Sequence, residues 1–261
     1  MDGALLLALG LAVLVGVSLG LMGGGGSILT VPILTYVLGM EPREAIAASL
    51  FIVGVTSAVS VFSHARSNRV RWKTGIVFGV AGMAGAFAGG LLGGLIPGVV
   101  LMVLFAIMMI ATATAMIRGR KKSADGDEAE RAELPLLRIV LDGFVVGIAT
   151  GLVGAGGGFL IVPALNLLGG LPMAIAVGTS LLVIAMKSFA GLAGYLFSTA
   201  VNWPVVLAFT GVAVVGSFLG SMLAGRIPEK ALRRGFGVFV LVVGAFVLVQ
   251  ELPELIATFA G

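Results

Sequence analysis

Lys187 is the residue with the clearest chemical potential, because it lies inside the apolar stretch IAVGTSLLVIAMKSFAGLAGYLF. An ammonium in hydrocarbon costs at least about 2.5 kcal/mol on insertion scales, so such residues generally serve function. The other Lys and Arg residues lie at the ends of apolar segments or between them. We expect Lys187 to contact an anionic substrate. The alternatives are that its ammonium reaches the outer membrane interface, or that it pairs with Asp142 or Glu44.

Two glycine runs form the second candidate site. The stretch GLMGGGGSILTVPIL at 20–34 returns as GLVGAGGGFLIVPAL at 151–165. Glycine allows close approach by another group, and the helix that starts after each run presents free N–H groups and a positive dipole end. Broken backbone is tolerated in a membrane only where protein buries it or where it lines a wet cavity. We therefore expect both helix starts to face one anion site near the midplane.

Close helix packing is the alternative reading of glycine in this chain, because small residues let membrane helices touch. We assign that role to the spaced glycines Gly85-x-x-x-Gly89-x-x-x-Gly93 and Gly216-x-x-x-Gly220. The prolines that follow the glycine runs, Pro32 and Pro163, are expected to distort the short helices in which they lie.

The candidate substrate-binding set combines the glycine runs with Lys187 and with nearby hydroxyl and amide groups. Hydroxyls and amides can donate hydrogen bonds to oxyanion oxygens, although Ser and Thr in membrane helices often bond back to their own helix. The set is Gly23, Gly24, Gly25, Gly26, Ser27, Ser49, Gly154, Gly156, Gly157, Gly158, Asn166, Thr179, Ser180 and Lys187.

The composition predicts an integral membrane protein. The chain is 59% hydrophobic and 11% charged, with a mean hydropathy of +1.18, whereas a soluble domain carries about 25% charged residues. The absence of Cys excludes disulfides and thiolate metal sites. No carboxylate lies in the middle of an apolar segment, which argues against a cation transporter and leaves His64, Glu44 and Asp142 as weak proton-relay candidates. We expect no metal, no cofactor and no enzymatic activity, since no nucleophile–base pair is visible.

Eight apolar segments have about the 20 residues needed to cross hydrocarbon. They are 3–22, 43–63, 74–96, 98–117, 136–154, 173–197, 204–225 and 232–250, with shorter apolar pieces at 27–39 and 158–170. The first segment lacks a basic leader and is expected to be a retained membrane segment rather than a signal peptide. The polar stretch 118–135 reads as a solvated linker.

A constant offset of 131 residues indicates an internal duplication. It pairs Gly20 with Gly151, Pro32 with Pro163, Ser49 with Ser180 and Trp72 with Trp203. We therefore expect a first repeat at 1–117, the linker at 118–135, and a second repeat at 136–261.

Loop charge predicts that the repeats are inverted. The connection 64–73 is basic and its counterpart 196–204 is uncharged, whereas the connection around Ile96 is uncharged and its counterpart around Ile227 is basic. Placing the basic loops and the linker in the cytoplasm puts both termini outside, including Glu251. The expected fold is an all-α polytopic membrane protein of two inverted repeats. Each has about four spanning helices plus one short helix after a glycine-rich break, giving 8–10 membrane segments.

The short segment can form a full crossing or half of a re-entrant hairpin, since both arrangements satisfy the predicted topology. The linker, the termini and the loop charges do not distinguish them.

The two glycine-run motifs and the sequences that follow them resemble those of the TauE/SafE sulfite exporter family. The resemblance rests on GLMGGGGSILTVPIL with AASL at 47–50 and on GLVGAGGGFLIVPAL with GTSL at 178–181, and it covers nearly the whole chain. It implies transport of sulfite, sulfoacetate or related organosulfur anions across the bacterial plasma (inner) membrane, but it supplies no sulfite-specific residues.

The expected function is thus secondary transport of a small anion by alternating access. An anion channel and a non-transporting membrane subunit are the alternatives. The expected partners are the anionic substrate and the lipid bilayer, with no nucleic acid; a homo-oligomer is left open.

Overall fold

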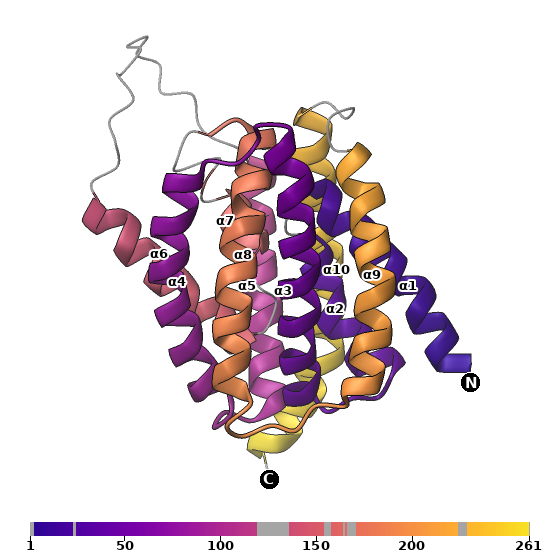
Figure 1. Ribbon diagram of the computed structural model, residues 1–261. Helices are drawn as coiled ribbons and strands as arrows, with labels where there is room; N and C mark the ends of the chain where they lie inside the picture. The colour runs from indigo at the N-terminus through magenta and orange to yellow at the C-terminus, as the bar shows by residue number, and fades with distance from the viewer. Residues whose placement is uncertain are drawn as a thin grey trace.

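The computed structural model describes residues 3–22, 25–118, 136–153, 158–163, 165, 171–223 and 229–260. In this part of the chain all regular structure is helical (Figure 1). The helices are α1 (Gly3–Met22), α2 (Gly25–Pro32), the π-helix η1 (Ile33–Val37), α3 (Pro42–Arg66), α4 (Trp72–Gly93), α5 (Gly98–Arg118), α6 (Leu136–Val153), α7 (Gly158–Pro163), α8 (Met173–Tyr195), α9 (Trp203–Leu223) and α10 (Glu229–Ala260).

Proline marks the start of three of the long helices. Pro42 is the first residue of α3, Pro172 directly precedes α8, and Pro204 lies in the first turn of α9. Proline suits these positions because the first turn of a helix needs no N–H donor there and the ring sets a helical φ. The local sequence therefore determines where these helices begin.

Within the described residues, five helices are long and apolar enough to cross a membrane: α1, α3, α4, α8 and α9. Shorter apolar helices cover Ser27–Val37, Gly98–Thr114, Val140–Val153 and Gly237–Pro253. Together they confirm the prediction of an all-α multi-pass membrane protein.

Helices at equivalent positions in the two halves of the chain make equivalent packing contacts. A shift of 131 residues carries α1 onto α6, α3 onto α8, and α4 onto α9. In the structure α1 packs on α9 while α6 packs on α4, and α4 packs on α8 while α9 packs on α3. Equivalent helices also contact one another directly: α3 packs on α8, α5 on α10, and α2 on α7.

The central helices α3 and α8 run antiparallel. Gly54 of α3 lies against the ring of Phe189, and Gly191 of α8 lies against Leu50, so residue numbers rise along one helix as they fall along the other. The connection from α3 to α4 accordingly lies at the upper end of the bundle in Figure 1, and the connection from α8 to α9 at the lower end. These equivalent helices therefore lie side by side in opposite directions.

Spaced glycines bring two helix pairs into backbone contact. A Cβ at Gly85 of α4 would overlap the carbonyl oxygen of Phe144 in α6, and a Cβ at Gly216 of α9 would overlap Val13 in α1. Gly89 and Gly220 make the same close approach one turn further along. The packing role predicted for these glycines is confirmed.

Candidate functional site

Lys187 is buried in α8, where its side chain is 1% exposed. Its Nζ donates a hydrogen bond to Thr150 Oγ1 of α6 at 2.6 Å. The Thr150 hydroxyl donates in turn to Val146 O at 2.7 Å, so toward Lys187 it acts as an acceptor. Among the described residues no carboxylate lies within ion-pair distance of Lys187.

Neither predicted alternative for Lys187 describes its environment. The side chain does not extend to the surface of the bundle, because it is buried between helices. Glu44, one proposed partner, accepts a hydrogen bond from the Asn202 N–H at 3.0 Å instead. Asp142, the other, lies on an exposed face of α6. Lys187 is thus a buried amine whose described partner is a neutral hydroxyl.

Glycines on the adjacent helices make room for the lysine stem. A Cβ at Gly82 of α4 would lie 3.7 Å from Lys187 Cδ and 3.4 Å from the Gly143 carbonyl oxygen of α6. The ammonium therefore sits where α4, α6 and α8 meet.

The first half of the chain has no counterpart of this charge. The residue equivalent to Lys187 is Thr56, whose hydroxyl donates back to Ile52 O at 2.6 Å within α3. Leu19 stands where the second half has Thr150. The two halves share a fold but differ chemically at this level of the bundle.

The glycine runs are only partly within the described residues. Gly23, Gly24, Gly154, Gly156, Gly157 and Asn166 lie outside them. Gly25 and Gly26 begin α2, and Gly158 begins α7. Ser27, in the first turn of α2, is fully buried, and α2 packs against α7. The two short helices therefore meet inside the bundle.

The predicted hydroxyl donors do not converge on one point. Thr179 Oγ1 accepts the Arg71 N–H at 3.0 Å, and Ser180 Oγ donates to Val177 O at 2.7 Å. Ser49 Oγ is buried and has no partner among the described residues. From the register of α3 against α8, Ser49 and Ser180 lie about 20 Å apart along the helix axes at 1.5 Å per residue. They cannot bind one small anion together.

The short helix α2 changes into the π-helix η1 directly after Pro32. Proline has no N–H to donate, so the regular α-helical bonding is disturbed at this point, as predicted. π-helical turns occur frequently at functional sites. Tyr36, within η1, donates a hydrogen bond to Glu251 Oε1 at 2.6 Å.

The burial of Glu251 was not foreseen from the sequence. Helix α10 continues past residue 250 to Ala260, and the Glu251 side chain is only 5% exposed. The reason is the Tyr36 hydroxyl, which supplies a hydrogen bond from the opposite half of the chain.

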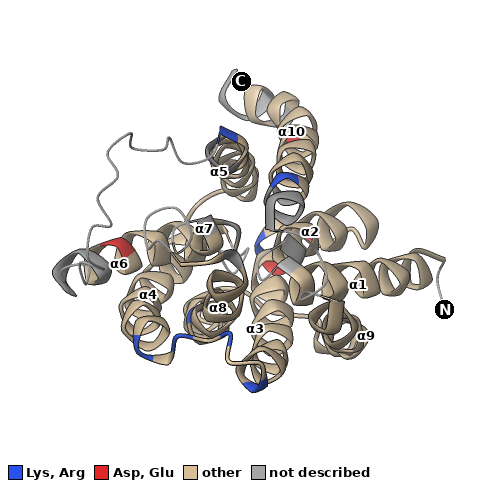
Figure 2. Cartoon of the chain, turned by 90° about the horizontal axis from the view of Figure 1, so that it is seen from above, with Lys and Arg blue, Asp and Glu red and all other residues tan. Residues whose placement is uncertain are grey.

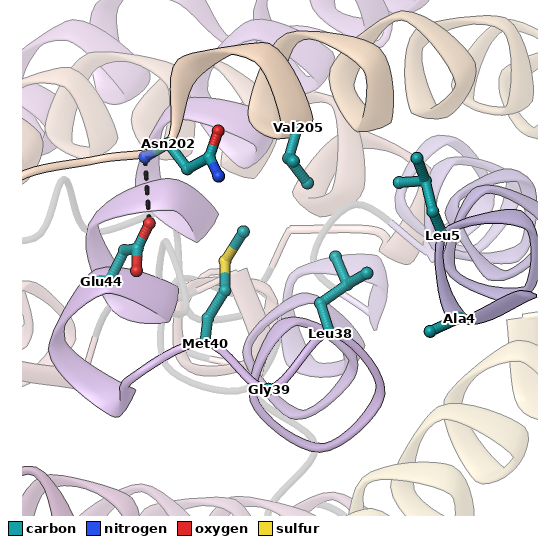
Figure 3. Close-up of a pocket in the computed structure, with 8 residues that line it drawn as sticks. All are labelled: Ala4, Leu5, Leu38, Gly39, Met40, Glu44, Asn202 and Val205. Carbon is teal, nitrogen blue, oxygen red and sulfur yellow. Dashed lines mark hydrogen bonds between the residues drawn. The ribbon is translucent and has the colours of Figure 1, made fainter. Parts of the chain in front are cut away.

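A pocket of about 360 Å³ opens where α1, α3 and α9 begin (Figure 3). It is lined by Ala4, Leu5, Leu38, Gly39, Met40, Glu44, Asn202 and Val205. Most of these side chains are apolar, and the charged one is the Glu44 carboxylate, which would repel an anion. This pocket is therefore unfavourable for binding the anionic substrate predicted from the sequence.

Two buried serines were missed by the sequence reasoning. Ser57 of α3 and Ser188 of α8 are fully buried, and their hydroxyls have no partner among the described residues. The signal was present, because the 131-residue offset that pairs Ser49 with Ser180 also pairs Ser57 with Ser188.

Known proteins resemble this chain over almost its full length. Residues 8–247 match the family described as Sulfite exporter TauE/SafE. A probable membrane transporter protein of Xylella fastidiosa (strain Temecula1) is 34% identical over 257 residues, covering 97% of this chain and 98% of that protein. A probable membrane transporter protein of Methanocaldococcus jannaschii is 31% identical over 262 residues, covering 93% and 96%.

More distant relatives carry the same description. A probable membrane transporter protein of Bacillus subtilis, YunE, is 26% identical over 249 residues, covering 86% of this chain and 90% of that protein. No solved structure matches the chain. With its helical membrane fold and the match over residues 8–247, the chain belongs to the TauE/SafE sulfite exporter family.

Proposed function

We propose that this protein is a secondary transporter that moves a small anion across the plasma membrane by alternating access of two inverted halves. The substrate class is a sulfur oxyanion or organosulfonate, such as sulfite or sulfoacetate. The observation that carries the proposal is Lys187, a buried ammonium whose described partner is one neutral hydroxyl. The protein acts as a carrier and not as an enzyme.

The chemistry of Lys187 supports an anionic substrate. An ammonium has three donors, of which one goes to Thr150. Buried charges are ordinarily paired, and intramembrane cations ordinarily mark a substrate path or a ligand counter-ion. An oxyanion would supply both the opposite charge and acceptors for the other two donors.

The packing of the helices supports inverted halves. Equivalent helices α3 and α8 lie antiparallel. Helices α5 and α10 do the same, because Gly244 of α10 lies against Met109 of α5 while the earlier Gly237 lies against the later Ile117. In transporters of this kind the binding site lies between the repeats, and each repeat can tilt against the other. The contact between α2 and α7 supports a binding site where the two short helices meet.

The distribution of charge supports the orientation. Lys and Arg residues of the connection between α3 and α4 lie together at one edge of the bundle end seen in Figure 2. With this end in the cytoplasm, the 118–135 linker is cytoplasmic and both termini are outside. An inside-negative potential then favours anion export by about 2.3 kcal/mol per charge per 100 mV, without a coupling ion.

The test is anion flux in proteoliposomes, with sulfite, sulfate, thiosulfate, sulfoacetate and chloride, with and without an imposed potential. We expect saturable flux of a sulfur oxyanion or sulfonate that follows the potential. Lys187→Ala should lower this flux at least tenfold, and Lys187→Arg should retain part of it. Lys73→Ala is the matched control, because Lys73 is exposed at the start of α4. This variant should transport the anion at the rate of the parent protein.

Three outcomes would contradict the proposal. Absence of flux for every anion above empty liposomes would remove the transport function. Flux that never saturates and carries single-channel current would indicate a channel. Normal flux in a well-folded Lys187→Ala protein would remove Lys187 from the substrate site; size-exclusion chromatography and thermal unfolding of each variant establish that it is folded.

A further inference from the structure

The central helix α3 carries a line of buried polar atoms that have no partner in the described part of the chain. The hydroxyls of Ser49, Ser57 and Ser60 and the Nδ1 of His64 have no hydrogen-bond partner among the described residues. All four side chains are at most 2% exposed. At 100° per residue they fall within an arc of about 80° on one face of the helix. We call this face, made of Ser49, Ser57, Ser60 and His64, the polar stripe.

Several other buried hydroxyls of the bundle bond within their own helices. Thr56 donates to Ile52 O, Thr150 to Val146 O, and Thr210 to Val206 O, each within its own helix. Such back-bonding is the ordinary way in which a membrane helix satisfies a hydroxyl. The serines of the stripe do not use it, so water or a solute must supply their partners if they are to be satisfied.

The second half of the chain adds one residue to the stripe at its middle. Ser188 of α8 is the 131-residue equivalent of Ser57 and is likewise buried and without a described partner. Ser57 lies one turn from Gly54, which packs on α8, and Ser188 lies one turn from Gly191, which packs on α3. Helical periodicity thus places both hydroxyls on the mutually facing sides of α3 and α8.

The stripe also has defined neighbours in the proposed transport machinery. Ser188 directly follows Lys187 in α8, and the register of α3 against α8 places Ser57 near the same level of the bundle. At the other end, His64 Nε2 lies 3.1 Å from the Gly20 carbonyl oxygen, in the last turn of α1 before the first glycine run. The stripe therefore links the level of Lys187 to the glycine break.

We infer that the polar stripe of α3, joined by Ser188, lines the aqueous path along which the anion passes through the first half of the protein. This inference rests on the proposed transport function. The path is asymmetric, because Gly191 and Tyr195 replace Ser60 and His64 at the equivalent positions of α8. The serine hydroxyls supply donors to the oxyanion oxygens, and Lys187 supplies the charge.

The chain contains no Cys, which allows a clean accessibility test. Ser57→Cys, Ser60→Cys and Ser188→Cys each change one hydroxyl into a thiol of similar size. The membrane-embedded variants are treated with anionic methanethiosulfonate ethylsulfonate or with its cationic trimethylammonium analogue. Thr112→Cys is the control, because Thr112 is 6% exposed and its hydroxyl is satisfied by Met108 O at 2.8 Å in α5.

We expect the three stripe variants to react at least tenfold faster than Thr112→Cys, and the anionic reagent to react faster than the cationic one. Sulfoacetate should slow the reaction, and it is a suitable competitor because its sulfonate does not attack the reagent. Modification at Ser57→Cys should also block anion flux.

Stripe variants that react no faster than Thr112→Cys, in protein that still transports an anion, would overturn the path and leave the proposed function standing. Fast modification in protein that transports no anion would support the path and remove the proposed function. If the thiol variants do not fold, anion flux is measured instead in Ser57→Ala and Ser188→Ala. A flux reduced at least threefold with an unchanged melting temperature supports the path, and normal flux overturns it.

Discussion

His64 and Tyr195 occupy equivalent positions in the two halves, and each reaches the end of a helix that leads into a glycine run. His64 Nε2 lies 3.1 Å from Gly20 O of α1, and Tyr195 OH donates to Leu152 O of α6 at 2.6 Å. The last carbonyls of a helix lack partners within that helix. Each half thus uses a different polar ring to satisfy the same kind of helix end.

Tyr195→Phe tests the importance of this contact. The variant keeps the ring and leaves the Leu152 carbonyl without its donor, which should cost about 1–3 kcal/mol of unfolding free energy. We expect the apparent melting temperature in detergent to fall by several degrees. Phe197→Leu is the control, because Phe197 is 76% exposed. Equal melting temperatures for the two variants would show that the hydrogen bond is dispensable.

Thr150 should hold Lys187 in position through its hydroxyl. Thr150→Val removes the acceptor at nearly constant volume and leaves the buried ammonium without its described partner, so stability should fall by about 1–3 kcal/mol and anion flux several-fold. Thr150→Ser keeps the hydroxyl and should resemble the parent protein in both measurements. Both variants are measured by thermal unfolding and by flux in proteoliposomes. Equal stability and flux of Thr150→Val and Thr150→Ser would contradict the role of the Thr150 hydroxyl in positioning Lys187.

Substitution by alanine should affect stability differently at Gly85 and at Gly211. A Cβ at Gly85 would lie 2.8 Å from the Ile148 nitrogen of α6, so Gly85→Ala should force α4 and α6 apart and cost about 1–3 kcal/mol or more. Gly211 has nothing within 4 Å of a Cβ, so Gly211→Ala should be neutral or stabilise by up to about 1 kcal/mol. Yield of monodisperse protein and melting temperature measure both. A tolerated Gly85→Ala would contradict the close helix contact.

The membrane orientation can be read from two exposed connections. Ser67→Cys lies between α3 and α4, and Ala200→Cys lies between α8 and α9. On intact cells a membrane-impermeant maleimide should label Ala200→Cys, and it should label Ser67→Cys only after permeabilisation. The reverse pattern would invert the proposed orientation, and labelling of both from the same side would contradict opposite ends for these connections.

Much of the fold follows from local sequence features. The apolar lengths predicted the long helices, the glycine spacing predicted the close contacts of Gly85 and Gly216, and Pro32 predicted a distortion that the structure shows as η1. These properties depend on a residue and its near neighbours. Sequence reasoning succeeded here because propensity, periodicity and hydrophobic length are themselves local.

The hydrogen-bond partners of the site residues could not be predicted from local sequence features. Thr150 lies 37 positions from Lys187 along the chain, and Tyr36 lies 215 positions from Glu251. The grouping of Ser49 with Ser180 as members of one site fails because their helices run antiparallel and place them at different depths. An equivalent position in a repeat is not a neighbouring position in space.

The sequence by itself determined that this chain is a helical membrane protein, that its motifs recur at a constant offset of 131 residues, and that Lys187 lies inside an apolar segment. Hydrophobic length, a constant offset and the cost of a buried ammonium are readable without a structure. Only the tertiary structure decided which hydroxyl holds Lys187, that Glu251 is buried, and that the serine hydroxyls of the polar stripe have no partner among the described residues. Hydrogen-bond satisfaction depends on atoms brought together from distant parts of the chain, and therefore on how the helices pack.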